Sequence, residues 1–336
     1  MKNKVCFITV YFGEIPAFFG PFLNSCNWNP EFDFLLIHNK DIPYPIPKNV
    51  RAVRMSLDSF LKLLNETLNL QIKELPYYKL CDFRPAFGVL FEEYIKSYDF
   101  WGICDTDLMF GCLKDFINDS LLNNYDKIYT MGHLSLIRNV PECNLLFKTD
   151  TENSQNYIKV FKDPKNQIYD ELNGFTEKFI DTKKRVYKKK KCADLGLFKN
   201  RITVSTKLFF SLIQPQNRFK NYCTDKNYRW QLFLLNHGKI KKVFLKGNSM
   251  FIKEYNYIHK LEYGLKFFVD KSTDLIITQS GYVKDDEVFK KINSNTLKKS
   301  DIKKYNKPSI VRELYQSMYW ILLLTYRMKN EIKKRI

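Results

Sequence analysis

The sequence lacks several features that would assign it to a familiar class. None of its eight cysteines belongs to a Cys-x-x-Cys pair, which disfavours a zinc site, because structural zinc ligands usually come in such pairs. No apolar run approaches the ~18–20 residues of a membrane-spanning helix, and the nearest is Met318–Tyr326. The first residues hold too short an apolar run for a signal peptide. We therefore expect a cytoplasmic protein whose thiols are reduced and mostly buried.

Charge is distributed unevenly along the chain. Residues 1–180 hold 19 Lys and Arg against 23 Asp and Glu, whereas residues 181–336 hold 36 against 13, so the net charge of +19 arises in the second part. This asymmetry suggests a nucleic acid, an anionic membrane surface or a phosphorylated partner. A Lys-rich solvated surface, typical of an AT-rich genome, is the alternative. Since no nucleic-acid-binding module is recognisable, we expect no nucleic-acid partner.

The length and composition predict a folded core. A chain of 336 residues with 45% hydrophobic and 16% aromatic residues is long enough for one large domain plus an extension, or for two small domains. We expect most aromatic residues to pack in that core, with one or two tyrosines or tryptophans free to stack on a base or sugar. We predict a catalytic domain at residues 1–265 and a basic extension at residues 266–336.

Strand-like and helix-like segments alternate in the first part of the chain. Strands are expected at 4–13, 32–39, 50–56, 100–111 and 125–139, the last of these either one strand or two joined near Gly132. Helices are expected at 16–30, at 56–70 with Ser56 as N-cap, and at 87–95 with one apolar face. This order predicts an α/β fold built on a parallel sheet with helices on both faces, where ligands bind beyond the carboxyl ends of the strands.

The second part of the chain is harder to assign to a sheet. Residues 181–200 are basic and of low complexity, which predicts a surface loop. Residues 243–260 alternate apolar and polar side chains like a hairpin. From Pro308 the chain reads as a helix that is apolar in its middle and basic at its end, either packed on the domain or lying on an anionic membrane.

Two carboxylates interrupt the apolar stretch FWGICDTDLMFG. Asp105 and Asp107 form the one Asp-x-Asp in the chain and follow directly on a predicted buried strand. Carboxylates are rarely buried unless they are paired or hold a metal. Mg²⁺ and Mn²⁺ bind such oxygens together with the phosphates of a substrate, and the metal neutralises charge on a diphosphate leaving group. The alternative is that one aspartate caps a turn.

The surrounding residues resemble those of bacterial polysaccharide-biosynthesis proteins identified as glycosyltransferase-like. The resemblance covers residues 5–260 in five blocks: YFGEIPAFFGPFLNSCNWNPEFDFLLIHN, PYYKLCDFRPAFGVLFEEYIKSYDFWGICDTDLMFG, MGHLSLIRN, IYDELNGF and YNYIHK. It implies a GT-A type fold, a mixed sheet flanked by helices in which Asp105 and Asp107 bind Mn²⁺ or Mg²⁺ and the diphosphate of a nucleotide sugar. The basic helical extension lies outside the resemblance.

The resemblance also implies roles for residues elsewhere in the chain. His259 would complete the metal shell, although a structural histidine is the alternative. Asp170 and Glu171 would be acceptor-side carboxylates, and an inverting transfer needs such a base. Donor contacts would come from eight residues: Tyr11, Phe12, Gly13, Asn39, Lys79, Asp82, Arg84 and His133. Ser135 lies with His133 on the strand after the metal motif. Asn39 stands where relatives more often have Asp, and Asp82 has the alternative of pairing with Arg84 or capping the helix.

The favoured hypothesis is a metal-dependent glycosyltransferase at the inner face of the cell membrane. It would transfer a sugar from a nucleotide-diphosphate donor to a growing, lipid-linked capsular or surface polysaccharide. Two alternatives stay open: a basic protein that binds nucleic acid or membrane without catalysis, and an inactive assembly subunit that retains the fold. Donor binding that depends on a metal would separate the first hypothesis from the other two.

Overall fold

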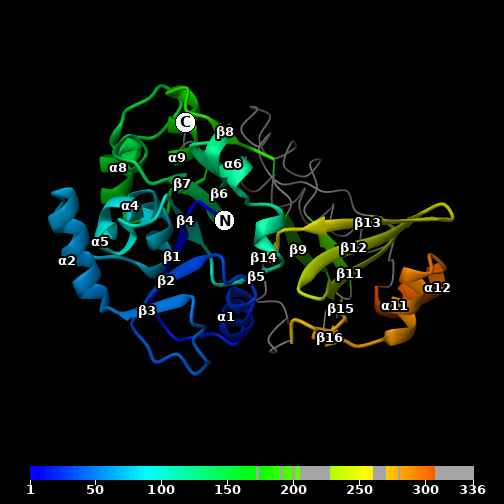
Figure 1. The fold of residues 1–336 in the computed structure, drawn as a ribbon. Helices are drawn as coiled ribbons and strands as arrows, with labels where there is room; N and C mark the ends of the chain where they lie inside the picture. The colour runs from blue at the N-terminus through cyan, green and yellow to red at the C-terminus, as the bar shows by residue number, and fades with distance from the viewer. Residues whose placement is uncertain are drawn as a thin grey trace, which may run out of the picture.

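A computed structural model describes residues 1–171, 174–189, 192–198, 201–204, 228–259, 270–278 and 281–306 (Figure 1). The basic helix expected from Pro308 onward lies outside these residues. None of the helices in these ranges has the length and apolar character needed to cross a bilayer.

A seven-stranded sheet forms the centre of the first 190 residues, in the order β3-β2-β1-β4-β7-β6-β8. Every strand except β7 runs in the same direction, and β7 is antiparallel to both of its neighbours. The mixed sheet flanked by helices that the resemblance implies is thereby confirmed, whereas the fully parallel sheet predicted from the order of elements is wrong at β7. Its strands are β1 (Val5–Tyr11), β2 (Asp33–His38), β3 (Val50–Arg54), β4 (Phe100–Cys104), β6 (Lys127–Met131), β7 (Leu134–Arg138) and β8 (Val186–Tyr187).

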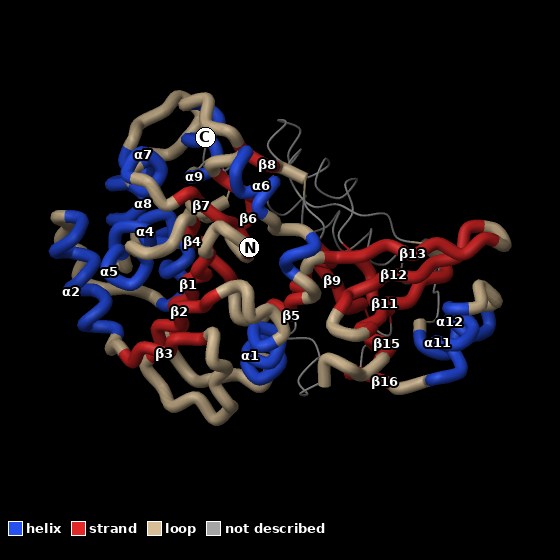
Figure 2. The backbone as a smooth tube through the Cα atoms, in the orientation of Figure 1, coloured by secondary structure: helices blue, strands red, loops and turns tan. Residues whose placement is uncertain are grey.

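Both faces of this sheet are apolar, because alternate side chains of a strand point to opposite faces. Cys6 and Ile8 of β1 face a core built with α2–α5 and α7–α9. Val5 and Phe7 face a second core built with α1, α6 and a short strand. In Figures 1 and 2, α2 and α5 lie on one side of the central strands and α1 on the other. The helices are α1 (Phe19–Asn27), α2 (Leu57–Leu68), α3 (Leu80–Phe83), α4 (Phe87–Leu90), α5 (Glu92–Ile95), α6 (Asp119–Asn124), α7 (Pro141–Asn144), α8 (Tyr157–Lys162) and α9 (Phe175–Asp181).

The helix predicted at 56–70 begins as expected. Ser56 is its N-cap and accepts a hydrogen bond from the backbone N–H of Ser59, which satisfies one of the open donors of the first turn. The prediction of a single helix at 87–95 is wrong. At Phe91 the backbone leaves the helical region (φ −115°, ψ 25°), so the segment divides into α4 and α5. Four of the five residues of its predicted apolar face are nevertheless buried, and Tyr94 is half-buried.

The strand predicted at 100–111 is also divided. Strand β4 ends at Cys104, and β5 (Leu108–Phe110) belongs to a second, four-stranded sheet of order β10-β9-β14-β5. Asp105 and Asp107 therefore lie in the turn between two sheets. The prediction of a surface loop at 181–200 is also wrong, because this segment contains the strands β8 and β9 (Cys192–Phe198). The other two strands of this sheet are β10 (Arg201–Val204) and β14 (Tyr257–His259).

A third sheet of five antiparallel strands, in the order β13-β12-β11-β15-β16, extends to the right in Figure 1. The predicted hairpin is present as β12 and β13. Strands from both sides of residue 265 pair in this sheet, and the division into 1–265 and 266–336 stays a prediction. The elements are β11 (Trp230–Asn236), β12 (Lys239–Lys246), β13 (Ser249–Tyr255), β15 (Leu275–Thr278), β16 (Gly281–Val283), α11 (Asp286–Asn293) and α12 (Lys299–Tyr305).

Candidate active site

The carboxyl ends of three neighbouring parallel strands meet at one edge of the central sheet. Strand β1 pairs in parallel with β2 and β4, so the residues after Tyr11, His38 and Cys104 emerge together. The antiparallel strand β7 begins at the same edge, where the backbone N–H of Asp105 donates a hydrogen bond to the carbonyl of His133 at 3.0 Å. This is the edge at which open α/β sheets bind their ligands.

Asp105, Asp107 and His259 converge at this edge. One potential ligand atom from each residue lies within 4.8 Å of the other two. Nε2 of His259 is 3.6 Å from Oδ2 of Asp107, and the three side chains are 16–23% exposed. The cause is strand pairing, since β14 runs antiparallel to β5 and places His259 opposite Leu108. The structure thus brings together the three residues that the sequence analysis assigned to a metal.

His133 lies behind His259. The two imidazole rings stack with centroids 4.3 Å apart and an interplanar angle of 13°. The hydroxyl of Tyr257 is 3.0 Å from Nδ1 of His133, and the His133 side chain is only 4% exposed. His133 therefore supports His259 from below rather than presenting itself to a donor. Ser135 is fully buried and accepts a hydrogen bond from Lys127.

Arg84 connects the carboxylates on the other side of the cluster. Its guanidinium forms ion pairs with Asp105 and with Asp170, the latter at 2.9 Å, and donates to the carbonyl of Gly132 at 3.2 Å. Burial acts to lower the pKa of Arg84, but the surrounding acidic groups raise it well above its usual value. A permanently charged, planar group is thus held beside Asp105.

Asp170 and Glu171 approach the same edge from the loop before α9. Asp170 is 3% exposed, and Oε1 of Glu171 accepts a hydrogen bond from the N–H of Gly132 at 2.8 Å. A Cβ atom at position 132 would lie 2.2 Å from Oδ2 of Asp170, so only glycine permits this approach. The pKa of Asp170 is raised to about 7, chiefly by burial and also by the neighbouring Glu171 and Asp105, against the lowering effect of Arg84.

Lys79 and Asp82 occupy a different place from the one expected. Their side chains are 2% and 0% exposed and form an ion pair at 2.7 Å. The ammonium of Lys79 also donates to the carbonyls of Val160 and Lys165. Asp82 accepts from the backbone N–H groups of Gln167 and Tyr169. This buried pair fixes the loop that leads to Asp170, and its polar atoms do not reach the surface where a donor would bind.

The loop after β1 and the residue after β2 are in contact. The N–H of Gly13 donates to Oδ1 of Asn39 at 2.9 Å, and Gly13 has φ +118°, which favours glycine. Tyr11 is half-buried, and its hydroxyl donates to the carbonyl of Glu14. Phe12 is 5% exposed and packs edge-on against Phe60. Gly13 and Asn39 thus form one polar margin of the site, whereas Phe12 belongs to the core.

Three residues near the site were missed by the sequence analysis. Tyr257 holds His133, and Gly132 makes room for Asp170; both lie in blocks of the resemblance, which was a signal that could have marked them. Tyr78 has 77% of its surface exposed, and its pKa is raised by partial burial of the hydroxyl and then by Cys81, Asp105 and Asp170. Its place in the block that ends in Asp-x-Asp was a signal that could have marked it.

Comparisons with known proteins place the chain in a family. Residues 7–286 match a family of unknown function (DUF6625), and the chain belongs to that family. No curated protein matches the sequence. Among solved structures, one match is a "putative nucleotide-diphospho-sugar transferase" from Desulfovibrio desulfuricans G20. It is 10% identical over 55% of this chain and 79% of that chain, with a TM-score of 0.30.

Proposed function

We propose that this member of the DUF6625 family is a metal-dependent glycosyltransferase of the GT-A type. It would transfer a sugar from a nucleotide-diphosphate donor to a growing, lipid-linked capsular or surface polysaccharide. The observation that carries the proposal is the convergence of Asp105, Asp107 and His259 at the ligand-binding edge of a mixed α/β sheet. The sequence resemblance to polysaccharide-biosynthesis proteins supports the same activity.

The donor set fits a hard divalent cation. Two carboxylates and one imidazole offer ligand atoms within 4.8 Å of one another. Ligands bonded at 2.0–2.6 Å lie up to about 4–5 Å apart across an ion. Because Mg²⁺ prefers an all-oxygen shell, the imidazole favours Mn²⁺. When bound, the metal would neutralise the charge that develops on the diphosphate leaving group.

Arg84 would contribute the second positive charge of the site. It stands beside Asp105, and its side chain is 18% exposed. Arginine binds phosphate oxygens through two parallel N–H groups. Gly13 and Asn39 lie at the same sheet edge, and the two loops that their hydrogen bond joins would hold the nucleoside end of the donor.

Asp170 would handle the proton of the acceptor hydroxyl. A general base works best when its pKa lies near the working pH, and burial raises that of Asp170 to about 7. Arg84 orients this carboxyl through a hydrogen bond of 2.9 Å. Glu171 instead binds the backbone of Gly132, which fixes the turn between β6 and β7.

Thermal-shift measurements with nucleotide diphosphate sugars, with and without Mn²⁺, test the proposal. A bound donor raises the melting temperature by mass action. We expect a shift in melting temperature that requires Mn²⁺ and is lost in Asp107→Asn. It should be retained in Asp41→Asn, the matched control, because Asp41 pairs with Arg54 on the surface and its side chain is 91% exposed. A protein that no nucleotide sugar stabilises in Mn²⁺ would instead be the inactive assembly subunit, and binding to DNA that falls with salt would indicate the nucleic-acid alternative.

The acceptor would bring the enzyme to an anionic membrane. Residues 228–259 hold six Lys and Arg against one acidic residue, Glu254. On the hairpin β12–β13, Phe251 and Ile252 are 45% and 49% exposed, with Lys246 and Lys253 close by in sequence. Exposed apolar side chains can enter the interface of a bilayer, and neighbouring lysines are attracted to anionic headgroups. Replacing Phe251 and Ile252 by serine should reduce flotation with phosphatidylglycerol vesicles, whereas Ile46→Ser, also in an exposed position, should not.

A further inference from the structure

A cavity of about 650 Å³ lies on the α6 side of the central sheet. Binding sites for small ligands usually have volumes of 300–1,000 Å³. None of the metal-site residues Asp105, Asp107 and His259 lines it. Its lining includes Tyr125, which follows α6, Tyr129 of β6, and three residues in or beside β8: Arg185, Tyr187 and Lys189.

Three tyrosines from separate segments form an aromatic wall. The ring of Tyr187 lies 5.2 Å from that of Tyr125, edge to face, and 6.2 Å from that of Tyr129. Each ring offers an apolar face and a polar hydroxyl in the same side chain. Such surfaces suit a pyranose ring, which has apolar C–H groups on its faces and hydroxyls around its rim.

The backbone of Tyr129 is distorted at the base of this wall. Its φ is +65°, which a bulky residue rarely adopts, and the register of β6 against β7 shifts between Ile128 and Met131. A β-bulge of this kind redirects a side chain. The hydroxyl of Tyr129 also accepts a hydrogen bond from Asn256 at 3.1 Å. Backbone strain of this kind persists only where the surrounding structure holds it, and it is concentrated at functional sites.

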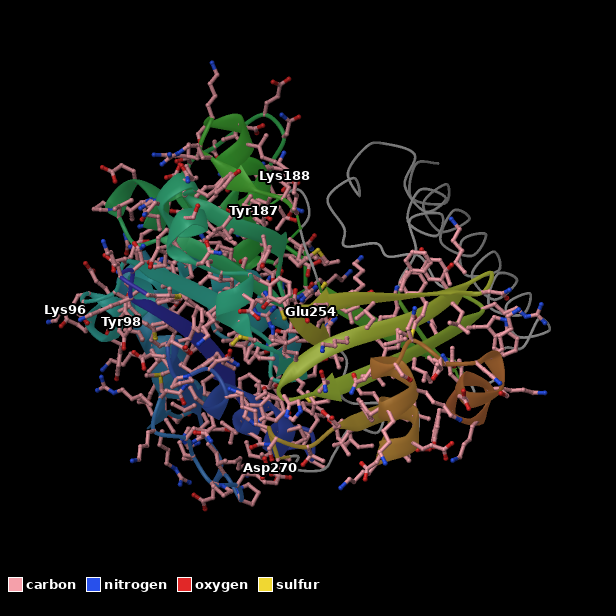
Figure 3. All side chains as sticks on the ribbon, turned by 45° about the vertical axis from the view of Figure 1, so that its right-hand side comes forward. Lys96, Tyr98, Tyr187, Lys188, Glu254 and Asp270 are labelled. Carbon is pink, nitrogen blue, oxygen red and sulfur yellow. The ribbon has the colours of Figure 1, made fainter. Side chains whose placement is uncertain are left out.

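The charged side chains at the cavity favour an anion. Residues 183–189 contain five basic residues: Lys183, Lys184, Arg185, Lys188 and Lys189. Arg185 pairs with Asp126, yet its side chain is still 57% exposed. The acidic lining residue Asp115 is balanced by Lys239 at 2.8 Å. In Figure 3, Tyr187 and Lys188 lie next to each other above the centre of the view, whereas Lys96 and Tyr98 lie at its left edge.

The cavity and the metal cluster share their supporting strands. Tyr129 lies on β6 and is bonded to Asn256, directly before β14. Tyr257 and His259 of β14 then contact His133, in the turn between β6 and β7. A ligand in the cavity is therefore held by the same two segments that position the metal cluster.

We propose that this cavity binds an anionic oligosaccharide, with sugar rings on Tyr125, Tyr129 and Tyr187 and carboxylate or phosphate groups on Arg185 and Lys189. It would hold the part of the acceptor glycan away from the reacting end, so the inference rests on the function proposed above. It also gives the basic segment around β8 a role in glycan binding, in place of a purely solvated surface.

Calorimetric titration of the full chain with oligosaccharides tests the inference without any transfer reaction. The probes are an oligogalacturonate, which carries carboxylates, a phosphorylated oligomannose, and an uncharged malto-oligosaccharide. We expect binding of one or both acidic probes, weaker by about tenfold in Tyr187→Ala and in Lys189→Gln. Tyr94→Ala removes a half-buried ring elsewhere, and Lys62→Gln removes an exposed cation elsewhere, and both should bind like the wild type.

The outcomes separate this inference from the proposed function. Absence of binding to both acidic probes, equal binding of the neutral probe, or full affinity in the Tyr187 and Lys189 variants would each overturn it. Mn²⁺-dependent donor binding measured on the same samples reports on the metal cluster alone. Glycan binding without donor binding would support the glycan-binding role of the cavity and contradict the proposed transferase function. Donor binding without glycan binding would contradict only the role of the cavity.

Discussion

Nε2 of His259 lies 3.6 Å from Oδ2 of Asp107, although the two residues are far apart in the chain. The pairing of β14 with β5 creates this contact, and the stacked ring of His133 holds the imidazole in place. A histidine supported in this way presents a fixed nitrogen beside two carboxylates. The same geometry serves a metal ion or a histidine–aspartate pair, and substitution distinguishes the two.

His259→Gln should weaken Mn²⁺ binding by roughly tenfold or more, since about 1.4 kcal/mol of lost ligand energy corresponds to a factor of ten. Electron paramagnetic resonance of free Mn²⁺ measures the affinity directly. His237→Gln is the matched control, because His237 also lies near an aspartate, with 3.7 Å to Asp274, but is 69% exposed and outside the site. Equal Mn²⁺ affinity in the two variants would leave His259 with a structural role only.

Arg84→Lys should reduce donor affinity by about tenfold while the protein remains folded. Lysine keeps the charge but cannot contact Asp105 and Asp170 at the same time, as the two ends of the guanidinium do. Hydrogen bonds to charged groups contribute about 1.5–3 kcal/mol each. Titration with a nucleotide diphosphate in Mn²⁺ gives the affinity, and an unchanged dissociation constant would remove Arg84 from the donor site.

Transfer should increase with pH through a transition near 7. Burial raises the pKa of Asp170 to about 7, and only the ionised carboxylate can accept a proton. This pKa in the folded protein exceeds the unfolded value near 3.8. Protonated Asp170 therefore contributes fully to the stability of the fold below pH 4, and this contribution is lost as the pH rises through 7. Rates and melting temperatures from pH 5 to 9 measure both effects. Asp170→Asn should remove both transitions, and their persistence would assign them to another group.

Lys79→Met should destabilise the protein by about 3–5 kcal/mol, because it leaves the carboxylate of Asp82 buried without its cation. Lys96→Met breaks an ion pair of the same spacing with Glu93, but those side chains are 69% and 82% exposed. Exposed pairs contribute about 0–1 kcal/mol. Urea unfolding compares the two variants, and similar losses would contradict the structural role assigned to Lys79.

Local patterns in the sequence predicted the elements near the site better than they predicted how those elements pack. The strands β1, β2 and β3 and the cap at Ser56 follow from apolar runs and one side-chain hydrogen bond. The helix predicted at 87–95 divides at Phe91, and the strand predicted at 100–111 divides after Cys104. Both divisions follow from tertiary packing, which overrides short apolar runs and is not encoded in their periodicity.

The sequence by itself determined the α/β character of the chain and the position of Asp105 and Asp107 after a buried strand, because both depend on neighbours in the chain. The resemblance to polysaccharide-biosynthesis proteins suggested His259, but no local pattern supported it. Only the tertiary structure decided that His259 reaches Asp107, that His133 stands behind it, and that Lys79 and Asp82 are buried beneath the site. These placements depend on pairing between β5 and β14 and on burial, which arise from residues distant in sequence and appear only when the chain is folded.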